Sequence, residues 1–184
     1  MYSEEELIHR CLKNDVKAQE EFYRRFAPKM YGVCLRFAKN QMEADDFLQE
    51  GFIKVFTNLK SFRNEGSLEG WIRRTIVNTA INLIKKNSKY LNDTDVEKAD
   101  LLPQDEAGAL NHLCVEELLE LIARLPVGYR MVFNLNVIEG YTHKEIGELL
   151  DISENTSKSQ LSRARQTLQK KISELQKSVN EQEV

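Results

Sequence analysis

The amino-acid sequence predicts an all-α fold in which an acidic linker joins two small helical domains. Glycine and proline, which interrupt helices, number only 8 and 3, and 30% of the 184 residues are charged. In several segments apolar residues recur with the period of a helix that is buried on one side. That periodicity fades at residues 89–111, so we expect domains over residues 1–88 and 112–184. A single domain with one long loop is disfavoured, because structureless loops of this length are uncommon in compact domains.

The net charge of −3 conceals three segments of alternating sign. Residues 60–89 hold seven Lys or Arg against two acids, and residues 153–171 hold five against one. Between them, residues 90–120 hold nine acids and one Lys. This distribution suits a polyanion that binds both basic segments and is repelled from the acidic one.

Several classes of protein are excluded by what the sequence lacks. No run approaches the roughly 18 apolar residues of a membrane span, and the start MYSEEELIHR does not resemble a secretory signal. We therefore expect a cytoplasmic protein without membrane insertion. Cys11, Cys34 and Cys114 are far apart and lack metal-ligand spacing, so we expect reduced, packed thiols, no metal and no cofactor. No nucleophile motif, P-loop or carboxylate pair indicates an enzyme.

The first two helices are expected over residues 4–12 and 18–39, with Pro28 marking a kink or a break in the second. A third helix is expected from Glu43. Its apolar positions form one buried stripe made of Leu48, Phe52, Val55, Phe56 and Leu59. Its opposite face carries Asp46, Gln49, Glu50, Ile53 and Thr57. Such a face can be simply solvated, but an apolar residue within a polar rim favours a docking surface.

A loop over residues 63–70 and a helix over residues 71–86 follow. The buried arc of this helix is expected to hold Ile72, Ile76, Val77, Ala80, Ile81, Leu83 and Ile84. The remaining arc carries Arg74, Thr75, Asn78, Asn82, Lys85 and Lys86, whose cations suit phosphates and whose amides suit base edges or sugars. A solvated basic face is the alternative. Trp71 and Phe62 are interpreted as core aromatics, and stacking of unpaired bases near the loop stays open.

The C-terminal part begins with two helices separated by Pro126 and Gly128, and Gly140 closes the second. Thr142 then caps a third helix, with Glu145 completing a capping box. Its buried positions are Ile146, Leu149 and Leu150. The chain turns at residues 151–153, and Ser153 or Asn155 caps a last helix that continues to at least Lys171.

The last helix has the pattern of a recognition helix in a helix-turn-helix. Its inward stripe is Leu161, Ala164, Leu168, Ile172 and Leu175. Its outward face holds Asn155, Ser159, Ser162, Arg163, Gln166 and Lys170, with no acid after Glu154. Lys158 and Arg163 can bond guanine or phosphate, the serines allow close approach, and Gln160 lies nearer the protein side. For Arg165 we expect a structural ion pair. This arrangement favours reading of a DNA major groove over a purely structural hairpin.

Two blocks of the sequence together resemble the extracytoplasmic function (ECF) group of bacterial RNA polymerase sigma factors, in the sigma-70 family. The first is ADDFLQEGFIKVF with LKSFRNEGSLEGWIRRTIVNTAINLIKK, and the second is LPVGYRMVFNLNVIEGYTHKEIGELLDISENTSKSQLSRARQTL. The resemblance covers nearly the whole chain. It implies a sigma region 2 helical bundle, a four-helix sigma region 4, core RNA polymerase and promoter DNA as partners, and in many members an anti-sigma factor.

The resemblance also assigns roles to residues of this sequence. Core polymerase would be met by Asp46, Gln49, Glu50 and Ile53. The minus-10 promoter element would be bound and opened by Arg63, Asn64, Arg73, Arg74, Asn78, Asn82, Lys85 and Lys86. The minus-35 element would be read as duplex by Asn155, Thr156, Lys158, Ser159, Ser162, Arg163 and Gln166.

This sequence departs from the usual family pattern at several positions. Val77 stands where Arg is frequent and Asn82 where Asp is frequent, while Gln160 replaces a frequent Arg. In the helix-turn-helix, the departures are Gly147 for Ala, Asp151 for the turn Gly and Ser157 for a buried Val. Asp tolerates the left-handed conformation of the turn. The hydroxyl of Ser157 is expected to return to a backbone carbonyl one turn back.

The alternative to a sigma factor is a free-standing helix-turn-helix regulator whose N-terminal helices dimerise or sense a signal. Such a dimer would bind symmetric half-sites one helical turn apart. The sequence offers no evident self-complementary apolar face for that dimer.

Overall fold

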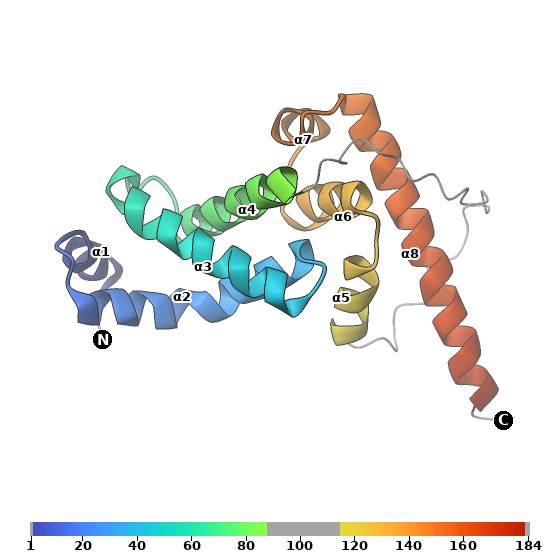
Figure 1. The fold of residues 1–184 in the computed structure, drawn as a ribbon, viewed down its shortest axis with the longest axis horizontal. Coiled ribbons are helices and arrows are strands. Elements are labelled where there is room, and N and C mark those ends of the chain that lie inside the picture. Colours follow the sequence, from blue (N-terminus) through green and yellow to red (C-terminus); the bar gives the residue numbers. More distant parts are fainter. Residues whose placement is uncertain (1, 88–114, 183–184) are drawn as a thin grey trace. The chain divides into compact units, whose positions relative to one another are not determined.

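The computed structural model describes residues 2–87 and 115–182, except for the side chains of residues 87, 115, 116 and 176–182. The chain divides into two compact units, Met1–Asn87 and Ser88–Val184. Every regular element in the described ranges is helical, as the sequence predicts (Figure 1). The predicted linker at residues 89–111 and Cys114 lie outside the described residues.

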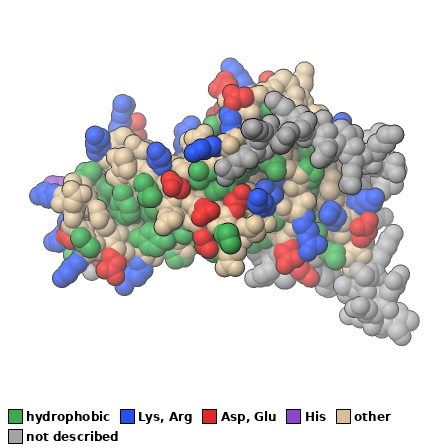
Figure 2. Space-filling model, in the orientation of Figure 1, with side chains coloured by type: hydrophobic (Ala, Val, Ile, Leu, Met, Phe, Trp, Pro, Cys, Tyr) green, Lys and Arg blue, Asp and Glu red, His purple; other side chains and the backbone are tan. Residues whose placement is uncertain are grey.

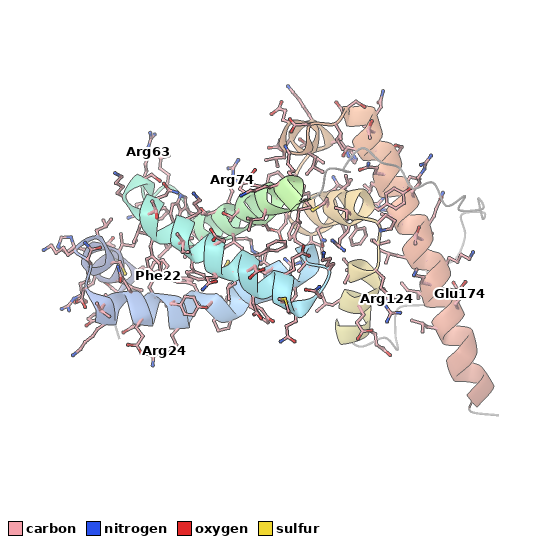
Figure 3. All side chains as sticks on the ribbon, in the orientation of Figure 1. Phe22, Arg24, Arg63, Arg74, Arg124 and Glu174 are labelled. Atoms are coloured by element: carbon pink, nitrogen blue, oxygen red, sulfur yellow. The ribbon has the colours of Figure 1, made fainter. Side chains whose placement is uncertain are left out.

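The N-terminal unit consists of α1 (Glu4–Leu12), α2 (Val16–Phe37), α3 (Gln41–Asn58), the 3-10 turn η1 (Leu59–Ser61) and α4 (Leu68–Asn87). Helices α2, α3 and α4 pack against one another, and α1 packs on α2. Their shared core contains Phe22, Phe37, Phe47, Met30, Ile72 and Ile76, all nearly or fully buried. In Figure 3 the ring of Phe22 lies between α2 and α3. Burial of these large apolar side chains is the main stabilisation of the unit.

Side-chain caps explain where these helices begin. Ser3, Asp15 and Asn40 each accept hydrogen bonds from backbone N–H groups of the first turn of α1, α2 and α3. Ser67 does the same for α4, because its Oγ accepts from the N–H of Gly70 at 3.0 Å. Helix α4 therefore begins at Leu68, one turn earlier than the periodicity alone predicted, and the preceding loop is correspondingly shorter.

Pro28 neither ends nor interrupts α2, which runs through it as one helix. The pyrrolidine ring is exposed, whereas Phe26, Ala27 and Met30 beside it are buried in the core. Packing on both sides of the proline thus outweighs the loss of one backbone hydrogen bond.

The C-terminal unit consists of α5 (Val115–Ala123), α6 (Val127–Phe133), the π-helical turn η2 (Asn134–Ile138), α7 (His143–Leu150) and α8 (Glu154–Gln182). Helices α5, α6 and α7 all pack on α8. One core cluster joins α5 to α8 and contains Leu121, Ile122, Leu125, Ala164 and Leu168. The buried Arg130 donates from Nη1 to the carbonyl of Ala123 at 2.7 Å, which satisfies one of the open carbonyls at the end of α5.

Candidate nucleic-acid interface

The turn between α7 and α8 has the predicted chemistry. Thr142 Oγ1 accepts from the N–H of Glu145 at 3.2 Å, and Glu145 Oε2 accepts from the N–H of Thr142 at 2.8 Å. This reciprocal capping box confirms the predicted start of α7. Asp151 ends α7 in the left-handed conformation, with φ of 57°. The two helices therefore meet at a fixed turn.

Ser153, rather than Asn155, caps α8. Its Oγ accepts from the N–H of Thr156 at 2.9 Å. Asn155 lies in the first turn and is exposed, so its amide can face a ligand.

The outward face of α8 is accessible over the length that the sequence predicted. Its exposed members are Asn155, Lys158, Ser159, Ser162, Arg163 and Lys170, and its half-buried members are Thr156 and Gln166. On the inward side Leu161, Ala164 and Leu168 are buried, Gln160 is also buried, and Ile172 is half-buried. Leu175 was expected in this stripe but is 38% exposed.

Two of the cations on α8 already have neighbours within the protein. Lys158 Nζ lies 2.6 Å from Glu154 Oε1, and the hydrogen bond from Lys158 is the largest cause that lowers the pKa of Glu154. Arg163 Nη1 donates a long hydrogen bond of 3.5 Å to the hydroxyl of Tyr129. Both side chains are exposed, so exchange of these partners for phosphate or guanine is sterically open.

Two further expectations about α8 are wrong. The Oγ of the fully buried Ser157 lies 2.9 Å from Nδ1 of His143 instead of bonding a carbonyl one turn back. The interhelical partner was not visible in the sequence because it is 14 residues away. Arg165 is exposed, and the expected ion pair does not occur among the described residues. Its position on the helix turns it outward past the edge of the apolar stripe.

A second basic surface belongs to the N-terminal unit, on α4 and the loop before it. Arg63 and Asn64 in the loop are exposed, and Asn64 has a positive φ of 61°. On α4 the exposed members of the predicted set are Arg74, Asn82 and Lys86, and the half-buried members are Arg73, Asn78 and Lys85. In Figure 3 Arg63 and Arg74 extend to the same side of the unit, while Arg24 on α2 extends to the opposite side. Arg63 and Arg74 thus lie on one side of the unit.

The aromatic pair at the base of this surface is half-buried. The rings of Phe62 and Trp71 lie 5.6 Å apart at 50°, so they pack against each other between the loop and α4. Oδ1 of Asn78 is buried and makes no hydrogen bond within the described part of the chain. Leu83, expected in the buried arc of α4, is only half-buried, whereas the other six members are buried.

The third surface is the acidic face of α3. Asp46, Gln49 and Glu50 are exposed, and Ile53 is 52% exposed among them. Figure 2 shows acidic side chains gathered over this helix. Met42 is 76% exposed and lies one turn before Asp46 on the same face. Met42 was not predicted on this face because the helix was expected to begin at Glu43, although an apolar residue four positions before Asp46 was an available signal.

No three His, Cys, Asp or Glu side chains come together as a possible metal site within residues 2–87 and 115–182. None of the helices described is both long enough and apolar enough to cross a membrane. The described thiols, Cys11 and Cys34, are buried.

Known proteins match both units. Residues 22–90 match Sigma-70 region 2, and residues 115–168 match Sigma-70, region 4. The ECF RNA polymerase sigma-E factors of Salmonella typhimurium and Escherichia coli are 29% identical over 180 residues, which cover 92% of this chain and 94% of theirs. The ECF RNA polymerase sigma factor SigW of Bacillus subtilis is 30% identical over 181 residues, covering 91% and 96% respectively.

A solved structure supports the fold. The sigma factor RpoE from Bartonella quintana, in complex with the anti-sigma factor NepR, aligns with a TM-score of 0.51 and 18% identity. The alignment covers 82% of this chain and 94% of that one. At this identity the likeness concerns the fold alone.

Proposed function

The chain belongs to the ECF group of the sigma-70 family, and from that premise we propose that it directs core RNA polymerase to promoters through two DNA-binding surfaces. Sigma factors are initiation factors without catalytic activity of their own. Its proposed partners are core RNA polymerase, promoter DNA and an anti-sigma factor, and its proposed place is the cytoplasm. The proposed division of labour follows the two domains expected at residues 1–88 and 112–184, with the linker between them.

The observation that carries the proposal is the capped helix-turn-helix with an exposed polar and basic face on α8. Three features fix the start of α8 relative to α7: the capping box at Thr142, the left-handed turn at Asp151 and the side-chain cap from Ser153. A helix held in this way and exposed along its outer face can lie in the major groove, with its N-terminal residues at base edges. We assign the minus-35 element to this surface, with Asn155, Thr156, Lys158, Ser159, Ser162, Arg163 and Gln166 as its contacts.

The basic surface of the N-terminal unit is assigned to the minus-10 element. Exposed Arg63 and Arg74 suit phosphates, whereas the amides of Asn64 and Asn82 suit base edges. Arg73, Asn78, Lys85 and Lys86 complete the proposed set. Opening of the duplex would expose bases beside the loop and the Phe62–Trp71 pair, and α4 would hold the backbone of the separated strand.

The acidic face of α3 is assigned to core polymerase. Ile53 and Met42 supply apolar contact area, and Asp46, Gln49 and Glu50 supply the polar rim around it. This face carries acids, so it is unsuited to DNA and suited to a basic protein surface.

Charge reversal on the two types of surface separates these roles. We expect Arg163→Glu to weaken binding of the holoenzyme to minus-35 duplex while the affinity of the chain for core polymerase is unchanged. We expect Asp46→Lys with Glu50→Lys to weaken binding to core polymerase while the affinity of the assembled holoenzyme for minus-35 duplex is unchanged. The measurements are fluorescence titrations of labelled chain with purified core polymerase, and of the holoenzyme with labelled duplex. Equal loss of core binding in both variants would overturn the assignment of faces.

A further inference from the structure

The contact between His143 and Ser157 is a polar link inside the apolar helix-turn-helix. Nδ1 of His143 and Oγ of Ser157 lie 2.9 Å apart, and Ser157 is 0% exposed. Ile146 and Leu150 on α7 and Leu161 on α8 are buried as well. A hydroxyl buried in such surroundings is costly unless it is hydrogen-bonded, so the imidazole satisfies a group that would otherwise destabilise the unit.

Both partners are attached to rigid backbone. His143 is the first residue of α7 and follows Thr142, which the capping box holds by two hydrogen bonds. One turn further along the same face of α7, Gly147 brings the backbone so close that an added Cβ would lie 2.8 Å from the carbonyl oxygen of Ile152. Ser157 is one turn inside α8, with its N–H bonded to the carbonyl of Ser153 at 3.0 Å. The His143–Ser157 hydrogen bond therefore connects two fixed points.

Ser157 lies on the side of α8 opposite its outward face, so a hydrogen bond that holds Ser157 also holds the rotation of that face. At 3.6 residues per turn, Asn155 and Ser159 each lie about 160° around the helix from Ser157. A rotation of α8 by about 20° would move side-chain tips on the far side by roughly 2 Å. Hydrogen bonds to base edges do not survive a displacement of that size.

We infer that His143 and Ser157 are a positioning pair, which holds the rotation of α8 and thereby sets which bases of the upstream element are read. The inference rests on the proposed function of α8. Apolar packing at position 157 would hold α8 at no particular angle, because the hydrophobic effect is non-directional. A hydrogen bond between an imidazole and a hydroxyl instead fixes the orientation of α8 relative to α7. Neither residue touches DNA in this account; both act through Asn155, Thr156, Lys158 and Ser159.

The test compares matched variants of the full chain in the holoenzyme. Ser157→Ala removes the hydroxyl, and His143→Phe keeps a ring but removes the hydrogen bond. His143→Asn is the rescue variant, because its short amide places a hydrogen-bonding atom near the position of Nδ1. His143 is only half-buried, so its two variants remain informative even if Ser157→Ala does not fold.

The readout is base preference, measured by selecting and sequencing promoter fragments with a randomised upstream element and a constant downstream element. We expect Ser157→Ala and His143→Phe each to lower the ratio by which preferred upstream bases are selected over other bases by roughly 3- to 10-fold. This is the size expected for one lost hydrogen bond. The double variant should lose no more than either single one, and His143→Asn should keep most of the preference. Binding to non-specific duplex should stay unchanged in all of them.

Two results distinguish the possible failures. If the variants lower the unfolding temperature but the folded holoenzymes keep the base preference of the wild type, the pair is only structural and the inference is overturned. If the wild-type holoenzyme itself selects no upstream sequence, the proposed function of α8 is overturned, and the inference with it.

Discussion

Gly147 has no room for a side chain. A Cβ at this position would lie 2.8 Å from the carbonyl oxygen of Ile152, which belongs to backbone and cannot rotate away. Glycine at this position therefore permits the close approach of α7 to the turn, and the departure from Ala in the family pattern has a structural reason. The backbone of the turn would have to shift to admit even a methyl group.

We expect Gly147→Ala to lower the free energy of unfolding of the C-terminal unit by about 1–3 kcal/mol, as overpacking typically does. Gly32→Ala is the matched control, because its added Cβ meets nothing within 4 Å and a glycine inside a helix is unfavourable. That control should be neutral or stabilising by up to about 1 kcal/mol.

Urea denaturation measures both variants. Trp71 is the single tryptophan, so its fluorescence follows the N-terminal unit, whereas circular dichroism follows helices of both. Gly147→Ala should shift the dichroism transition and leave the fluorescence transition in place. A variant as stable as the wild type would show that the turn can move aside.

Because Cys11 and Cys34 are buried, we expect the free energy of unfolding to fall as the pH becomes alkaline. Burial raises the pKa of Cys34 from 9.0 to about 12, and burial with the nearby charge of Asp15 raises that of Cys11 to about 11. Both pKa values are higher in the folded state than in the unfolded state. The free energy of unfolding that the buried, protonated thiols contribute is therefore fully present below pH 9 and is lost as the pH rises towards the folded pKa values.

We therefore expect the difference in unfolding free energy between the wild type and Cys34→Ala to shrink as pH rises from about 8 to about 11, as linkage requires. Urea titrations at several pH values measure it. A difference that stays constant over this range would mean that Cys34 is accessible to water in the folded protein.

At the scale of residues, hydrogen bonds between near neighbours in the sequence could be predicted, whereas contacts between different helices could not. The capping box of Thr142 and Glu145 was predictable because it depends on residues three apart. The partner of Ser157 depends on how α7 and α8 cross, so the local rule for serine in helices gave the wrong acceptor.

The helices themselves were mostly predictable, because each carries an apolar stripe with helical period. Their ends were less so: α4 begins at Leu68 because Ser67 caps it, and α2 continues through Pro28 because its neighbours are buried. The π-helical turn η2 had no signal in the sequence, since its apolar residues also fit an α-helix. It leaves Val137 and Ile138 exposed, at 47% and 37%.

Helix α4 provides a prediction at the scale of an element. We expect Arg74→Glu to weaken promoter opening and to reduce the dependence of log affinity on log salt by about one unit, because one phosphate contact is lost. Arg24→Glu is the matched control, since Arg24 is exposed on the opposite side of the same unit (Figure 3). Permanganate reactivity of the opened strand and salt titrations of holoenzyme binding measure the two effects. Equal effects of both variants would mean that general charge, rather than this face of α4, governs opening.

At the scale of the whole molecule, the N-terminal unit presents exposed basic residues on α4 and the loop before it as well as the acidic face of α3, and the C-terminal unit presents exposed basic residues on α8. The sequence could predict this division because the charges are segregated along the chain.

Transcription in vitro with purified core polymerase and promoter fragments tests the central proposal most directly. We predict initiation at specific promoters only when this chain is added, and no such initiation by core polymerase alone. If the chain confers initiation on none of the candidate promoters, yet binds palindromic duplex tightly without polymerase, it is a free-standing regulator and the account is wrong.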